Sequence, residues 1–379
     1  MQNRTANCLA KLERMNKALR HQEPDRVPIG DFFWGSFIER WRKDLGLPPD
    51  TDIYRYYDLD WQVTNPNMDP HIRPFELLEE TDEMVMVRTG FDAVIRKKFA
   101  DPMPAFLVFE TDTIDKLLDF QFDDPFDPRR YFESGDNQLS GLGDGYYRNT
   151  PAWIETVRSL YPDFPVYGSV CEGYELLWRI TGPENAMYWM LLYPDEFGTF
   201  MNRLKTYLEG ITLGQLQAAG GMLDGMVIWG DVAYGRDMLF SPESWRRFFK
   251  PVVQSLSDIC HEQGIPVIYH GCGNSHRIFR DLIEMGIEAY NPMEKKAGMD
   301  VVEFRKEFGH EMAFCGGFDV LTWANGSSED LKNLVIHNLK AAIGGGYIFQ
   351  SDHSVPSNVS GQNYDYVVKL VRKMGRYPL

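Results

Sequence analysis

The stretch Ile265-Pro266-Val267-Ile268-Tyr269-His270-Gly271-Cys272-Gly273-Asn274 is the most informative part of the chain. A short apolar run leads to a histidine and, two positions later, a cysteine. If the run is a β-strand, residues two apart point to the same side, so His270 and Cys272 aim together beyond its carboxyl end. A neutral imidazole beside a thiolate is a soft metal half-site, and zinc is the commonest metal that suits it. The alternative is a buried histidine and cysteine without a metal.

This stretch is one step in a regular alternation of strands and helices. Runs typical of strands occupy residues 29–34, 58–63, 165–170, 225–231, 265–270, 287–291, 312–315 and 347–350. Eight strands alternating with helices predict a parallel (β/α)8 TIM barrel in the α/β class. A doubly wound sheet is the alternative, and it is disfavoured because no GxGxxG follows the first strand. We expect one domain over residues 1–379.

Two local signals add detail to this barrel. Two extended runs between Met84 and Ile95 flank a Thr89-Gly90 turn, which predicts a β-hairpin insertion near 84–108. Ser241, followed by Pro242, has the residue types of a helix N-cap and first position, so a helix is expected over about 242–263.

The composition limits the partners. The chain has 379 residues, 44% of them hydrophobic, and a net charge of -16, which argues against nucleic acid because phosphate binding needs a basic surface. The 14% aromatic content exceeds what a core needs and suits a pocket for a flat or apolar ligand. Five cysteines without CxxC, no signal peptide and no run of transmembrane length favour a cytoplasmic protein with reduced thiols and no membrane partner.

Polar residues follow nearly every expected strand. In a parallel barrel the carboxyl ends of the strands meet at one face, where functional side chains gather. Read in order, these ends carry Asp31, Asn65, Glu172, Asp231, His270 with Cys272, Asn291, Cys315, and Asp352 with His353. Each also has a structural explanation, because aspartates after strands often cap helices and an asparagine before proline often makes a turn. As a ring they would face one cavity.

A catalytic zinc needs three protein ligands and an open position. His270, Cys272 and Cys315 supply three, with His353 as the competitor for the third place. We expect acid–base groups at Asp231, His353 and Glu172, and we expect the substrate to contact Asp31, Asn291 and Tyr269.

Several motifs resemble the uroporphyrinogen decarboxylase superfamily over residues 165–365. They are Pro165-Val166-Tyr167-Gly168, Val227-Ile228-Trp229-Gly230-Asp231, His270-Gly271-Cys272-Gly273-Asn274, Gly316-Gly317-Phe318-Asp319 and Gly345-Gly346-Tyr347-Ile348. The resemblance implies a single (β/α)8 barrel. It also implies one of two chemistries: decarboxylation without a cofactor, or zinc-dependent methyl transfer to corrinoid proteins.

The resemblance favours the methyltransferase branch. The decarboxylases carry an arginine in the segment that here reads 30–35 and a catalytic aspartate where this chain has Val63-Thr64-Asn65-Pro66, so both features are absent. The methyltransferases carry a His-x-Cys…Cys motif, which His270 and Cys272 match. Their second cysteine lies near the eighth strand, where this chain reads Gln350-Ser351-Asp352-His353.

The function expected from this resemblance is zinc-dependent transfer of a methyl group between a small substrate, such as an O-methyl compound, and a corrinoid carried by a partner protein. A decarboxylase acting on a porphyrinogen or another carboxylate is the first alternative, and a non-catalytic ligand-binding barrel is the second. Family members are often homodimers, so the resemblance implies one here.

Overall fold

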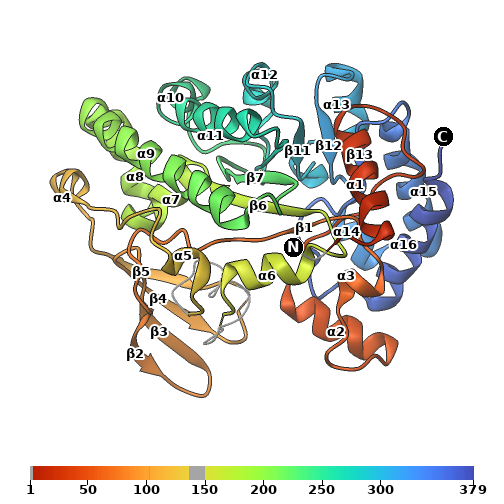
Figure 1. Ribbon diagram of the computed structural model, residues 1–379, viewed down its shortest axis with the longest axis horizontal. Coiled ribbons are helices and arrows are strands. Elements are labelled where there is room, and N and C mark those ends of the chain that lie inside the picture. The colour runs from red at the N-terminus through yellow and green to blue at the C-terminus, as the bar shows by residue number, and fades with distance from the viewer. Residues whose placement is uncertain (1–2, 102, 136–149) are drawn as a thin grey trace.

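Seven short parallel strands form the central sheet of the computed structural model, which describes residues 3–101, 103–135 and 150–379 (Figure 1). In spatial order they are β1 (Gln62–Val63), β6 (Val166–Cys171), β7 (Gly225–Trp229), β10 (Val267–His270), β11 (Ala289–Asn291), β12 (Ala313–Cys315) and β13 (Tyr347–Ile348). The spatial order is also the chain order, and each strand pairs in parallel with the next. The sheet therefore forms a half-barrel of an α/β fold, which confirms the predicted α/β class and the parallel strand order, whereas the predicted full (β/α)8 barrel would need an eighth strand.

Helices fill the connections and surround the sheet (Figure 1). They are α1 (Ala6–Leu19), α2 (Gly35–Leu45), α3 (Ile53–Tyr56), α4 (Ile114–Asp119), α5 (Arg129–Phe132), α6 (Trp153–Leu160), α7 (Gly173–Thr181), α8 (Pro183–Leu192), α9 (Pro194–Ala219), α10 (Pro242–Phe248), α11 (Lys250–Glu262), α12 (Phe279–Glu284), α13 (Val301–Phe308), α14 (Val320–Asn325), α15 (Ser328–Leu339) and α16 (Gly361–Met374). The Ser241 side chain caps α10 by accepting from the Ser244 amide at 3.0 Å, as predicted. No helix in the described ranges is long and apolar enough to span a membrane.

The expected first strand, residues 29–34, is not a regular strand. It makes only two single-residue parallel bridges, Ile29 with Phe349 and Phe33 with Val355. The Ile29 carbonyl also accepts from the Asp60 amide at 2.8 Å. Pro28 has no amide hydrogen to donate, which interrupts the ladder at its start. Seven of the eight expected strands are therefore present among the described residues.

The inward-facing residues of the strands pack into a small core of their own. This core contains Tyr167, Val227, Ile268, Ala289, Ala313, Cys315 and Ile348. Met15, Ala18 and Leu19 of α1 belong to the same cluster and close it. The polar residues lie beyond the carboxyl ends of the strands.

The expected hairpin is the middle of a larger antiparallel sheet. Its strands, in order, are β2 (Glu76–Glu80), β3 (Met84–Arg88), β4 (Ala93–Lys98) and β5 (Ala105–Phe109). β3 and β4 pair antiparallel around the predicted turn. One face buries Phe75, Val85, Val87 and Ile95 with Phe106. We call residues 75–109 the inserted sheet; it lies to one side of the parallel strands (Figure 1). A separate two-stranded hairpin, β8 (Ala233–Tyr234) and β9 (Asp237–Met238), follows β7.

Candidate active site

A cavity of about 400 Å³ lies between the carboxyl ends of the parallel strands and the inserted sheet. The strand ends contribute Asn65, Asp231 and His270 to its lining, and the inserted sheet contributes Phe91, Ile95 and Phe106. Of the polar residues expected at the strand ends, these three line the cavity. Its volume is within the range of small-molecule sites.

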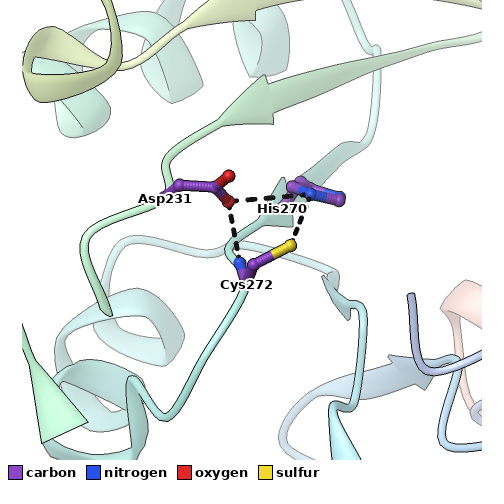
Figure 2. Close-up of side chains that lie close together, drawn as sticks. All are labelled: Asp231, His270 and Cys272. Atoms are coloured by element: carbon purple, nitrogen blue, oxygen red, sulfur yellow. Dashed lines mark hydrogen bonds and ion pairs between the residues drawn. The ribbon is translucent and has the colours of Figure 1, made fainter. Parts of the chain in front are cut away.

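Three side chains with metal-binding atoms converge (Figure 2), and two of them, Asp231 and His270, line this cavity. The Sγ atom of Cys272 lies 3.6 Å from Nε2 of His270, and that nitrogen lies 3.7 Å from Oδ1 of Asp231. The backbone amide of Cys272 donates to the same carboxylate oxygen at 2.8 Å. This is the one group of three or more potential ligands whose donor atoms lie within 4.8 Å of one another in the part of the chain that the structure describes.

Strand register brings these residues together. His270 ends β10 and pairs with Trp229 at the end of β7, so Asp231 and Cys272, each two residues further, lie side by side. Gly273 makes the turn possible with φ at +78°, where a β-carbon would lie 2.8 Å from backbone atoms of the β8 hairpin. The Gly273 amide donates to Glu294 at 2.6 Å, which anchors the turn.

His270 is held in the form that binds metals. Its Nδ1 donates to Oδ1 of Asn291 at 2.6 Å, which leaves the lone pair of Nε2 facing Cys272 and Asp231. Burial lowers the pKa of His270, which favours the neutral ring. Asn291, expected to contact substrate, instead lies buried behind the histidine and orients it.

The donor set fits zinc. Imidazole nitrogen, thiolate sulfur and carboxylate oxygen are zinc's usual ligands, and two of them on a tetrahedral ion lie roughly 3.5 Å apart. The observed separations of 3.6 and 3.7 Å are close to that value. Burial raises the pKa of the Cys272 thiol well above its ordinary range, so a cation is needed to hold the thiolate.

Cys315, the expected third ligand, does not join this group. It ends β12, two strands from β10, and its buried thiol donates to Oε1 of Gln350 at 2.9 Å. Burial raises its pKa. Asp231, expected as an acid–base group, is the third member of the cluster.

Tyr269 and Asp31 are also placed differently from the expectation, since neither is among the residues lining the cavity. Tyr269 points to the opposite face of β10 from His270, and its hydroxyl donates to the Gly230 carbonyl at 3.2 Å. Asp31 is buried and accepts from the Ser351 hydroxyl, and burial raises its pKa to about 7.

Of the expected acid–base groups, Glu172 and His353 are not among the described residues that line the cavity. Glu172 is fully buried and caps α7 by accepting from the Tyr174 amide at 3.3 Å, and burial raises its pKa to about 8. The ring of His353 stacks on Trp34, which does line the cavity, at 6.5 Å between centroids.

Two lining residues were missed at the sequence level. Glu175 and Arg179 stand one turn apart on α7, form an ion pair, and face the cavity. Burial raises the pKa of Glu175. The i, i+4 spacing of opposite charges on a helix after a strand end was the available signal.

The parallel sheet and the ligand cluster at its carboxyl edge define an α/β protein with an enzyme-like site. A family model described as uroporphyrinogen decarboxylase (URO-D) matches residues 148–374, well over half of the chain. The chain belongs to the uroporphyrinogen decarboxylase family, as the motifs indicated.

A solved structure agrees with this chain in fold. The chain is similar to a methyltransferase from Methanosarcina mazei, with 16% identity and a TM-score of 0.62, over 96% of this chain and 98% of that one. A B12-independent methionine synthase from Shewanella matches at 12% identity and a TM-score of 0.39, over 60% of this chain and 69% of that one. No curated protein matches by sequence.

Proposed function

We propose that this protein is a zinc-dependent methyltransferase that moves a methyl group between a small substrate, such as an O-methyl compound, and a corrinoid carried by a partner protein. The observation that carries the proposal is the cluster of Asp231, His270 and Cys272 at the wall of a mainly apolar cavity. Membership of a family with enzymatic members and the methyltransferase-like fold support it.

The chain's own residues have separate tasks in this proposal. His270, Cys272 and Asp231 would hold zinc, which as a Lewis acid would polarise an oxygen of the substrate. Asn291 keeps Nε2 of His270 turned toward the site. As the C–O bond breaks, the methyl group bonds to an electron pair of the acceptor, and the donor oxygen keeps the electron pair of the broken bond and takes a proton. Glu175, a protonatable group with a raised pKa on the cavity wall, is assigned to supply that proton.

The same cavity argues against decarboxylation of a polycarboxylate. Its lining includes the acidic residues Asp69, Glu175 and Asp231, against one arginine, Arg179, which Glu175 already engages. A substrate with several carboxylates would find no unpaired arginine or lysine among the described lining residues.

We also propose that the barrel is closed, in one domain, by residues 29–34 acting as the eighth strand. Two contacts of Ile29 support this. Its bridge with Phe349 joins the segment to the β13 edge of the seven-stranded sheet, and the hydrogen bond from the Asp60 amide to its carbonyl joins it to the β1 edge.

The experiment uses free cob(I)alamin as acceptor and a panel of methyl ethers and methanol as donors. Methylation of cobalamin is followed by its absorption spectrum for the zinc-loaded wild type, for Cys272→Ser, and for Cys260→Ser as the matched control, since Cys260 lies in α11 away from the site. We expect turnover with the wild type and Cys260→Ser and none with Cys272→Ser. Equal rates in all three would refute the proposal.

A further inference from the structure

Aromatic rings dominate the cavity from both sides. Phe33, Trp34 and Trp229 line it from the strand ends, and Phe75, Phe91 and Phe106 line it from the inserted sheet. Trp229 stands beside the metal-ligand cluster, edge-to-face with His270 at 4.7 Å between centroids. Rings on opposing walls suit a flat ligand, because aromatic groups gain from stacked and edge-to-face contacts.

The charged residues of the cavity limit the class of ligand further. The carboxyl groups of Glu175 and Asp231 face the cavity, and Arg179 is held in its ion pair. In the metal-free protein an anion would meet these carboxyl groups, and the one arginine among the described lining residues is already paired. A small ammonium ion is disfavoured by size, because a cavity of about 400 Å³ leaves most of these rings beyond contact with it.

We propose that the cavity admits a flat, uncharged aromatic ring, and that the inserted sheet is the wall that selects it. The inference rests on the proposed function in one respect only: transfer of a methyl group carried by that ring would be the reaction proposed above. Binding of the ring itself requires neither zinc nor a corrinoid.

A substitution of Phe106 tests most directly whether the inserted sheet selects the ligand. It lies on β5, lines the cavity, and contacts Trp178 edge-to-face at 5.0 Å between centroids. Its neighbour Leu107 points to the other face of the strand and is 44% exposed. The two positions form a matched pair on one strand, so a general effect on the sheet would appear in both.

The experiment is calorimetric titration of the full-length, metal-free protein with methoxybenzene, methoxycyclohexane, benzoate and tetramethylammonium. We expect methoxybenzene to bind at least tenfold more tightly than each of the others. Phe106→Ala should raise its Kd by about threefold to tenfold, through loss of one aromatic contact. Leu107→Ala should leave it within twofold. If Phe106→Ala fails to fold, Phe106→Leu replaces it. This variant keeps apolar volume but loses the ring, and its Kd should lie above that of Leu107→Ala.

Tighter binding of benzoate, tetramethylammonium or methoxycyclohexane would overturn the inference, as would equal Kd values for the variants at positions 106 and 107. Failure here is separable from failure of the proposed function. A protein that binds methoxybenzene but no zinc retains this inference and loses the methyltransferase. A protein that binds zinc but not methoxybenzene loses this inference and leaves the methyltransferase proposal standing.

Discussion

Replacing Asp31 by asparagine should change the pH dependence of stability. Asp31 is buried, accepts hydrogen bonds from Ser351 and from the Phe32 amide, and has its pKa raised from 3.8 to about 7, mainly by burial. A carboxyl group with a raised folded-state pKa stabilises the fold most when protonated. Its contribution is fully present below pH 4 and is lost as the pH rises through 7.

The magnitude follows from the shift. About three pKa units correspond to roughly 4 kcal/mol in total, of which roughly 2.5 kcal/mol falls between pH 5 and pH 8. Asparagine is close in shape and does not ionise in this range. Relative to wild type, Asp31→Asn should therefore be more stable at pH 8 than at pH 5, with the difference in unfolding free energy larger at pH 8 by about that amount.

The assay is reversible urea unfolding of both proteins at the two pH values. Asp25→Asn is the matched control, because a hydrogen bond from Arg14 lowers the pKa of Asp25 and the group stays ionised throughout this range. Its difference from wild type should be the same at pH 5 and pH 8. A pH-independent difference for Asp31→Asn, or one of opposite sign, would refute the reasoning.

Three further substitutions test individual contacts. Asn291→Ala should weaken zinc binding about 10- to 100-fold by releasing His270, measured by competition with a chelator, and unchanged affinity would contradict the orienting role. Tyr269→Phe should leave zinc affinity intact and lower the free energy of unfolding by about 1 kcal/mol through the lost hydrogen bond to Gly230. Loss of zinc binding in this variant would show that Tyr269 belongs to the site after all. Ser241→Ala should cost about 1 kcal/mol in urea unfolding through the lost N-cap, and no change would contradict that contact.

Local periodicity explains why most of the fold could be predicted. Strands such as β6 and β10 are short apolar runs followed by polar residues, and that signal is contained in the sequence itself. The first strand of the inserted sheet, β2 (Glu76–Glu80), was missed because it is exposed throughout and lacks the apolar alternation of β3.

The site was predictable only as far as single strands allow. The period of two placed His270 and Cys272 together, and the same rule would have turned Tyr269 away. The third member of the cluster depends on how β7 and β10 are aligned, and sequence periodicity does not give that register. Asp231 was therefore assigned to acid–base chemistry, and Cys315 was expected to reach across an intervening strand.

Zinc content per chain, measured by mass spectrometry on protein purified without chelators, tests the central claim most directly. We expect about one zinc per chain in the wild type and in Cys315→Ser, because the Cys315 thiol is engaged with Gln350. Cys272→Ser should lose most of the metal and Asp231→Ala much of it, because each removes one member of the ligand cluster. Full zinc in Cys272→Ser, or none in a wild type supplied with zinc, would contradict the assignment.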